Sequence, residues 1–314
     1  MIFLKALVTG ASGFVGQAMS RKLLESNIET LGISRSSSFV NGQKNDDFIC
    51  DILDKSKLKK IINAFKPNLV LHLAGPAFIP NSFDKPQETY DVIFQGTLNL
   101  LETLRGLESD SKVLFVSSAD VYGSNTKKVL AETEPYEPLN PYSSAKACSE
   151  LLCKQFSRSY GLHVVIARPF NHTGPGQSKE FVCSNFASQI ASMDAKKKNK
   201  LITGNIDVKR DFLDVRDVVD AYYELLQKAT PGEVYNVCSG KAISIREVIQ
   251  ILFKQTNLDK YEIIIDPKKL RKNDISIRIG NNKKIFEKTG WVPRISIEKT
   301  MQDLLIYWKE NLNV

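Results

Sequence analysis

The chain has 314 residues and a mass of 35.3 kDa, enough for one large α/β domain and a smaller one but too few for three ordinary domains. Its composition of 42% hydrophobic and 25% charged residues, with a mean hydropathy of −0.20, excludes a disordered, collagenous or membrane-spanning chain. The net charge of +8 favours an anionic partner: a nucleic acid, a phosphorylated metabolite or a membrane surface.

Cysteines and targeting signals indicate the compartment. The five cysteines are scattered and form no Cys-x-x-Cys pair, so neither a disulfide framework nor a zinc site is indicated. Met1–Thr9 lacks a basic stretch followed by an apolar one, so we expect no secretory signal. The most apolar stretch, Asn68–Pro80, is far shorter than the roughly 20 residues of a membrane-spanning helix. We therefore expect a cytoplasmic protein with no bound metal.

The first half of the chain alternates short β-rich runs with longer helical patterns. In chain order these are strand Ile2–Val8, helix Val15–Ser26, strands Glu29–Ile33 and Phe48–Asp51, helix Lys55–Phe65, strand Leu69–Leu73, helix Pro86–Leu107, strand Val113–Ser117, helix Pro141–Tyr160 and strand His163–Ala167. Strands and helices that alternate at this spacing predict parallel pairing with right-handed crossovers. The sequence thus predicts an α/β fold with a doubly wound parallel sheet.

After Arg168-Pro169 the pattern changes. The predicted elements are a loop at Asn171–Gln177, helix Phe181–Met193, a lysine run at 196–200, helix Val215–Gln227, strand Val234–Val237, and a tail from Ser244 that holds a helix, strand Tyr261–Ile265 and a last helix. We expect a dinucleotide-binding domain at 1–168, to which the chain returns around residues 209–237. Residues 169–208 and 238–314 would form a smaller mixed α/β substrate domain. Residues 1–170 have a net charge of +2 and residues 171–314 of +6.

Three glycines follow the first predicted strand and open the first helix. Gly10, Gly13 and Gly16 have the spacing G-x-x-G-x-x-G. They allow a tight turn, close approach of a pyrophosphate, and packing of the helix on the sheet, while the helix N-terminus favours phosphate. No Lys-Ser/Thr pair follows, which excludes a P-loop nucleoside triphosphatase. A merely tight turn would look similar, but the strand–turn–helix context favours dinucleotide binding.

The end of the second strand distinguishes the two nicotinamide cofactors. Ser34, Arg35 and the serines that follow include no Asp or Glu to bind a ribose 2′-hydroxyl. A basic residue instead suits a 2′-phosphate. An exposed loop arginine is the alternative interpretation. The sequence therefore favours NADP(H), with NAD(H) possible.

Tyr142 and Lys146 are four residues apart on one predicted helix and share a face. A tyrosine with its ordinary pKa of about 10 is a poor acid–base group, and a neighbouring ammonium favours the phenolate. A Tyr-x-x-x-Lys pair also occurs by chance as a surface pair. Ser118 strengthens the functional interpretation, because it ends the fifth strand at the sheet edge where ligands bind.

These residues together resemble the extended short-chain dehydrogenase/reductase family. The matching segments span the chain in order and are Thr9–Gly16, Leu71–Gly75, Gly96–Leu101, Ser117–Gly123, Pro141–Lys146 and Arg168-Pro169. The resemblance implies a Rossmann-type fold, a nucleotide-sugar substrate and a catalytic triad of Ser118, Tyr142 and Lys146. One departure is Ile93, where the family usually has an asparagine that helps to hold the active-site helix.

The resemblance also implies the cofactor-binding residues. They are Gly10, Ser12, Gly13, Phe14, Val15, Gly16, Ser34, Arg35, Asp51, Ile52, Leu73, Ala74, Gly75, Tyr142 and Lys146.

Three further segments resemble the branch of the family that handles GDP-sugars. They are Arg168–Gln177, Lys209–Val215 and Val234–Gly240. The implied substrate-binding residues are Ser118, Asp120, Asn171, Val182, Arg210, Arg271 and Asp274. Arginines bind a diphosphate bidentately, which agrees with these assignments. For Arg210 the alternative is a structural ion pair with Asp211 or Asp214.

Ala119 and Asp120 distinguish reduction from dehydration within this branch. The 4,6-dehydratases typically place acid–base groups, including a glutamate, just after the triad Ser or Thr. Alanine transfers no proton, and aspartate is one methylene shorter than glutamate, a loss of reach that matters where roughly 1 Å of misplacement costs about 10²-fold in rate. For Asp120 the alternative is a loop cap. We interpret the pair as a site that retains hydride transfer and lacks elimination.

The expected function is NAD(P)H-dependent reduction of the C4 ketone of a GDP-4-keto-6-deoxyhexose to GDP-D-rhamnose. Alternatives are a reductase that forms GDP-6-deoxy-D-talose, a GDP-mannose 4,6-dehydratase, and a non-catalytic dinucleotide sensor. The lysine run has no interleaved aromatics, so we expect neither nucleic acid nor membrane as a partner. The family implies a homodimer through a four-helix bundle of Pro86–Leu107 and Pro141–Tyr160.

Overall fold

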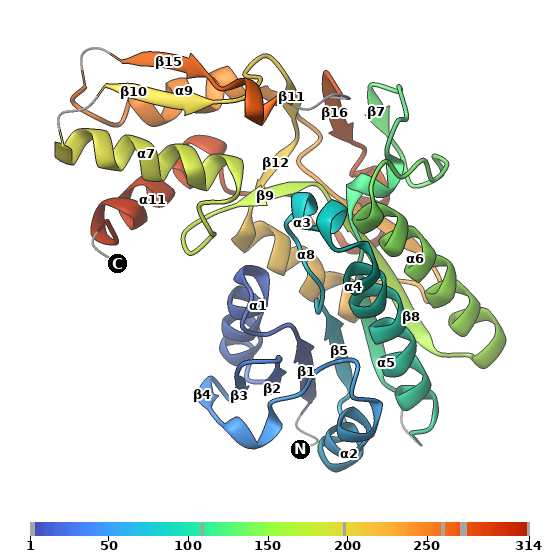
Figure 1. Cartoon of the computed structure of the whole chain (residues 1–314). Helices are drawn as coiled ribbons and strands as arrows, with labels where there is room; N and C mark the ends of the chain where they lie inside the picture. Colours follow the sequence, from blue (N-terminus) through green and yellow to red (C-terminus); the bar gives the residue numbers. More distant parts are fainter. Residues whose placement is uncertain (1–3, 108–109, 197–198, 259–260, 271–274, 313–314) are drawn as a thin grey trace.

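The computed structural model describes residues 4–107, 110–196, 199–258, 261–270 and 275–312. Its main sheet has eight strands in the order β13-β8-β6-β5-β1-β2-β3-β4, and every pair from β13 to β2 is parallel (Figure 1). The parallel strands are β1 (Lys5–Thr9), β2 (Glu29–Ile33), β5 (Leu69–His72), β6 (Lys112–Val116), β8 (His163–Pro169) and β13 (Val234–Val237). The predicted doubly wound α/β sheet is confirmed.

Helices cover both faces of this sheet, and the strand sequences show why. On β1, Ala6 and Val8 point to one face and Leu7 to the other, and all three are buried. The first face packs against α1 (Phe14–Glu25), α8 (Val215–Lys228) and α10 (Lys283–Thr289). The second packs against α2 (Lys55–Phe65), α5 (Gly96–Arg105) and α6 (Pro141–Tyr160).

The predicted strand Phe48–Asp51 is wrong. The edge of the sheet is instead an antiparallel hairpin of β3 (Ser38–Val40) and β4 (Gln43–Lys44). Its turn residues Asn41 and Gly42 have φ values of 49° and 80°, and an Asn-Gly pair is a strong hairpin signal. The hairpin occupies the edge of β2 along which a further parallel strand would have to pair.

The predicted helix Pro86–Leu107 is continuous but irregular. It follows α3 (Ile79–Asp84) and consists of α4 (Pro86–Tyr90), a π-helical turn at Asp91–Gln95 and α5. The predicted helix Pro141–Tyr160 is confirmed as α6. Its start is determined by Pro141 at the first position and a capping box of Asn140 and Ser143, and Gly161 ends it in the left-handed conformation.

Apart from β7, the strands of the three small sheets among the described residues come from the second half of the chain, and they lie against a helical layer. The strands are β7 (Val129–Leu130), β9 (Asn171–Thr173), β10 (Lys200–Thr203), β11 (Lys209–Arg210), β12 (Phe212–Asp214), β14 (Ile243–Ser244), β15 (Glu262–Ile265) and β16 (Ile277–Gly280). The helices α7 (Val182–Lys196), α9 (Ile245–Phe253) and α11 (Ile297–Glu310) pack on one another. The stretch predicted as the loop Asn171–Gln177 therefore begins with a short strand, and the two-domain division remains a prediction.

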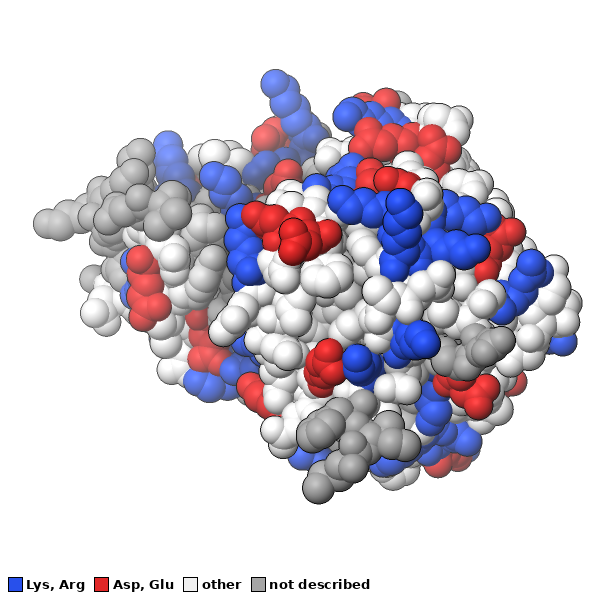
Figure 2. Space-filling view, turned by 90° about the horizontal axis from the view of Figure 1, so that it is seen from below, with Lys and Arg blue, Asp and Glu red and all other residues white. Residues whose placement is uncertain are grey.

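Charged side chains of both signs are scattered among uncharged ones on the lower face of the molecule. Figure 2 shows acidic groups among the basic ones on this face. Of the predicted lysine run, Lys196 ends α7 and Lys200 begins β10, while Lys197 and Lys198 lie outside the described residues. Within the described ranges, no helix combines the length and apolar character needed to cross a bilayer, and no group of three His, Cys, Asp or Glu could hold a metal ion.

Candidate active site

The glycine turn lies where the strand order reverses on the sheet. The backbone N–H of Gly10 donates to Ile33 O at the end of β2, at 2.9 Å. Gly10 has a φ of +72°, and a Cβ there would lie 2.9 Å from the Ala74 nitrogen. A Cβ on Gly16 would lie 2.3 Å from Gly10 O. Only glycine therefore allows the turn to approach the ends of both neighbouring strands this closely.

The N-terminus of α1 is suited to an anion. Gly13 caps the helix without a side-chain hydrogen bond, and the first turn has no acidic residue. Its backbone N–H groups therefore carry a positive potential that no carboxylate of the helix offsets. Phe14, in the first turn, stacks on His172 of β9 with ring centroids 6.4 Å apart. This cradle fits the pyrophosphate of a dinucleotide.

The other predicted cofactor residues lie along the same sheet edge. Leu73 N–H donates to Thr9 O at 3.2 Å, which holds the segment Leu73–Gly75 beside the turn. Cys50 N–H donates to Ser34 O at 3.0 Å, which brings Asp51 and Ile52 to the end of β2.

Arg35 follows Ser34 on this edge. Its side chain is 66% exposed and lies 4.0 Å from a Glu88 carboxylate oxygen. Its guanidinium is therefore accessible to a bound phosphate.

Ser118, Tyr142 and Lys146 come together at the carboxyl end of β6. The Lys146 ammonium donates to Val116 O at 2.7 Å, and its nitrogen lies 5.9 Å from the centre of the Tyr142 ring. Ser118 lies close enough to the Tyr142 hydroxyl to act on its pKa, which it lowers. Strand β6 and helix α6 thus bring together the three residues predicted as catalytic.

Burial dominates the protonation of this group. It raises the pKa of Tyr142, the Asp120 charge raises it further, and Ser118 opposes the shift. Burial also lowers the pKa of Lys146 to about 8, against the charges of Cys153 and Glu150. The sequence predicted that the Lys146 ammonium favours the Tyr142 phenolate, but the ammonium is directed at a carbonyl, and burial is the largest influence on the Tyr142 pKa.

A buried ion pair lies near the candidate catalytic residue Ser118 and was not predicted from the sequence. Arg168 and Glu150 are 1% and 0% exposed and are 2.7 Å apart. Ser117, next to Ser118, donates its hydroxyl to Glu150 at 2.5 Å, and Tyr136 donates to the same carboxylate at 2.9 Å. Glu150 lies one helical turn after Lys146, and that spacing was the available signal.

His72 connects the end of β1, just before the glycine turn, to helix α5. Its ring nitrogens hydrogen-bond the hydroxyls of Thr9 at 2.7 Å and Thr97 at 3.0 Å. Burial, with a smaller contribution from the Lys146 charge, lowers the pKa of His72 to about 3. Ile93, which replaces the usual asparagine, accepts a hydrogen bond at its carbonyl from Ser149 of α6. The π turn thus remains fastened to α6 without an asparagine side chain.

The predicted substrate residues differ in their placement. Asp120 follows Ser118 and is paired with Arg278, which the sequence did not single out. Asn171 begins β9 and precedes His172, the residue that stacks on Phe14. Val182 begins α7 and is 38% exposed. Arg271 and Asp274 lie outside the described residues.

Arg210 lies on β11 and donates to Ile275 O at 2.7 Å. The two carboxylates of the alternative interpretation have other partners. Asp214 binds Arg216 at 2.7 Å, and Asp211 accepts from Ser239 N–H at 2.7 Å.

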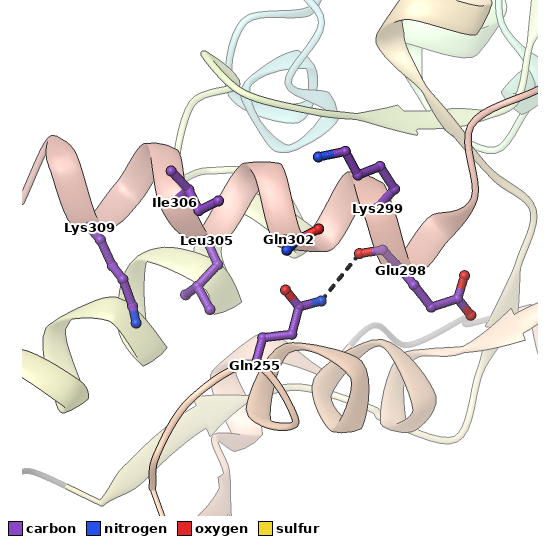
Figure 3. Close-up of a pocket in the computed structure, with 7 residues that line it drawn as sticks. All are labelled: Gln255, Glu298, Lys299, Gln302, Leu305, Ile306 and Lys309. Atoms are coloured by element: carbon purple, nitrogen blue, oxygen red, sulfur yellow. Dashed lines mark hydrogen bonds between the residues drawn. The ribbon is translucent and has the colours of Figure 1, made fainter.

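A separate groove of about 450 Å³ lies between the end of α9 and helix α11 (Figure 3). Gln255 donates across it to Glu298 O at 3.2 Å. The groove is lined by residues of the second half alone, which include none of the candidate catalytic side chains.

Known proteins match the chain over nearly its whole length. A family model described as GDP-mannose 4,6 dehydratase matches residues 7–304. A GDP-6-deoxy-D-mannose reductase from Pseudomonas aeruginosa is 36% identical over 311 residues, which are 98% of each chain. A GDP-mannose 4,6-dehydratase from Yersinia enterocolitica is 28% identical over 345 residues, with 96% of this chain and 92% of the relative covered.

Solved structures agree with this relationship. RMD from Pseudomonas aeruginosa complexed with NADPH has a TM-score of 0.88 and 35% identity, with 98% of this chain and all of the relative covered. UDP-glucose 4-epimerase from Thermotoga maritima with UDP-glucose has a TM-score of 0.89 and 28% identity, with 99% of this chain and all of the relative covered. The chain therefore belongs to the GDP-mannose 4,6 dehydratase family, within the extended short-chain dehydrogenase/reductases.

Proposed function

We propose that this chain is an NADPH-dependent reductase that acts on the C4 ketone of a GDP-4-keto-6-deoxyhexose and forms GDP-D-rhamnose. The observation that carries the proposal is the grouping of Ser118, Tyr142 and Lys146 at the carboxyl end of β6. The 36% identity to a GDP-6-deoxy-D-mannose reductase supports the substrate class.

The protonation of the site suits ketone reduction. Bound NADPH would supply the hydride. Tyr142, whose raised pKa keeps its hydroxyl protonated, would donate that proton to the C4 oxygen, and Ser118 would hydrogen-bond the same oxygen. Lys146 would hold the nicotinamide ribose with the ammonium hydrogens that Val116 O does not accept.

The cofactor choice rests on the end of β2. The cradle of Gly10–Gly16 fits either dinucleotide, because it recognises the shared pyrophosphate. Arg35 is exposed there and would bind the additional 2′-phosphate of NADPH. The relative complexed with NADPH supports the same choice, while NADH remains the second candidate.

Dehydration is disfavoured by the residues after Ser118. Ala119 is buried and apolar, and Asp120 is held in an ion pair with Arg278. The ion pair holds the Asp120 carboxylate against the Arg278 guanidinium and away from the position of a base in an elimination. GDP-mannose 4,6-dehydratase activity and formation of GDP-6-deoxy-D-talose are therefore the alternatives that the experiment must separate.

We also propose a homodimer through a four-helix bundle, in the cytoplasm. Helices α5 and α6 pack side by side at one flank of the molecule (Figure 1). Leu151 on α6 is 56% exposed, and Phe94 and Leu98 next to α6 are half-buried. Leu151→Asp should convert a dimer to a monomer in sedimentation experiments, whereas Ile306→Asp, an exposed apolar position on α11, should not.

The deciding experiment gives the purified protein GDP-4-keto-6-deoxymannose and NADPH and assigns the product by NMR. We expect consumption of NADPH and a D-rhamnose configuration at C4. A parallel reaction with GDP-mannose and NADP⁺ should give no 4-keto product. Rapid turnover there would replace the proposal with dehydratase activity, and no turnover in either reaction would favour a dinucleotide sensor.

A further inference from the structure

Arg278 reaches from the second half of the chain to the turn that follows Ser118. It lies on β16, and its side chain is 13% exposed. One guanidinium nitrogen is ion-paired with Asp120, and Nη2 donates to Gly123 O at 3.0 Å. Because these two acceptors belong to the turn Ala119–Tyr122 and the residue after it, one side chain holds the turn at two points.

This turn also holds Ser118 in place. The Asp120 backbone N–H donates to Ser118 Oγ at 3.1 Å, and Ser118 Oγ lies 3.5 Å from Asp120 Oδ2. Ser118 also lies close enough to the Tyr142 hydroxyl to lower its pKa. A change in the position of Asp120 therefore moves the hydroxyl that would orient the substrate carbonyl.

Strand pairing links Arg278 to the proposed nucleotide-binding residue. Strand β11 runs parallel to β16, with Arg210 opposite Arg278 in the register. The Arg210 guanidinium donates to Ile275 O, just before β16, at 2.7 Å. The two arginines thus lie on adjacent strands. Arg210 is expected to bind the diphosphate, and Arg278 holds the turn that follows Ser118.

We propose that Arg278 is a positioning residue that couples binding of the nucleotide diphosphate at β11 to the placement of Ser118 and the charge of Asp120. The proposal rests on the proposed function for its substrate. Arg278 holds the Asp120 carboxylate in an ion pair, which would also keep it away from the position of the base in an elimination.

The charges around Tyr142 give this proposal a second readout. Asp120 from the turn, Lys146 from α6 and Tyr222 from α8 act on the Tyr142 hydroxyl or share its electrostatic environment. Without Arg278, the uncompensated Asp120 charge would disfavour the phenolate more strongly. Tyr142 would then be a weaker proton donor, and kcat would fall for a reason that removal of the Asp120 charge reverses.

The first test needs no substrate. Hydrogen exchange of the segment 118–123 is compared in the wild type, Arg278→Met and Arg278→Lys. We expect faster exchange in Arg278→Met and partial recovery in Arg278→Lys. The matched control is Arg246→Met, which removes the surface ion pair with Asp207 and should leave this segment unchanged. Equal exchange in the wild type and Arg278→Met would overturn the proposal.

The second test measures turnover of GDP-4-keto-6-deoxymannose. Arg278→Met should lower kcat by about 10- to 100-fold with unchanged NADPH binding, because misplacement by roughly 1 Å costs rates of this order. The double variant Asp120→Asn/Arg278→Met should recover part of the lost kcat, because asparagine carries no charge. An unchanged kcat in Arg278→Met would overturn the coupling. A wild type that reduces no 4-keto sugar would instead overturn the proposed function, and the exchange test would still decide the role of Arg278.

Discussion

Lys146 of α6 donates its ammonium hydrogen to the carbonyl oxygen of Val116 at 2.7 Å. Val116 ends β6 two residues before Ser118, and Lys146 follows Tyr142 by one helical turn. One hydrogen bond therefore ties the strand that ends at the serine to the helix that carries the tyrosine. This contact helps to hold the three candidate catalytic residues in place relative to one another.

Replacement of Tyr142 by Phe tests the proposed proton donor. Loss of the hydroxyl should lower the rate of ketone reduction by about 10²- to 10⁴-fold, the usual contribution of general acid catalysis. NADPH binding, followed by its fluorescence, should persist. Tyr223→Phe on α8 is the matched control and should stay within about twofold of the wild type. Full activity in Tyr142→Phe would support the dinucleotide sensor instead.

Replacement of Arg35 by Ser tests the cofactor preference. Loss of a charge-assisted contact to the 2′-phosphate, worth roughly 1.5–3 kcal/mol, should raise the KM for NADPH by about 10- to 100-fold. The value of kcat/KM for NADH should change little, because NADH lacks that phosphate. Lys44→Ser, another exposed cation at this sheet edge, should change neither constant. Equal effects on both cofactors would show that Arg35 does not recognise the phosphate.

The buried pair of Glu150 and Arg168 should matter for stability. Glu150→Gln leaves the Arg168 charge buried without its partner and should cost about 3–5 kcal/mol in the free energy of unfolding. The double variant Glu150→Met/Arg168→Met removes both charges and should recover much of this loss. In the more exposed pair with Lys55, Glu102→Gln should cost less than about 1 kcal/mol. Urea unfolding measures all three, and a loss in Glu150→Gln no larger than the control would contradict the prediction.

His72 should make stability fall with acidity. Its pKa is about 3 in the folded state, below its ordinary value of 6.5, so the unfolded chain binds the proton more readily. The contribution is fully present above pH 6.5 and is lost as the pH falls toward 3, with a slope of up to about 1.4 kcal/mol per pH unit. The wild type should therefore lose more stability than His72→Gln between these limits. Identical slopes in urea unfolding would show that His72 does not titrate in this way.

The sequence by itself determined the doubly wound sheet and the glycine turn. Both follow from local patterns: β-rich runs alternate with helical ones, and Gly10, Gly13 and Gly16 stand between a strand and a helix. The Asn41-Gly42 pair is also a local hairpin signal, and the hairpin occupies the edge of β2 at which the predicted strand Phe48–Asp51 would have paired. Tyr142 and Lys146 were found for the same reason, since helical spacing places them on one face.

The tertiary structure decided the electrostatics of the site, because charges act on groups that are close in space and not in sequence. Arg278 meets Asp120 across 158 positions of the chain, and Arg168 meets Glu150 only because β8 lies under α6. Nor does spacing reveal burial, so the sequence predicted a lowered pKa for Tyr142 where desolvation raises it. The candidate catalytic residues were therefore predictable from local patterns, whereas their charge states follow from the packing around them.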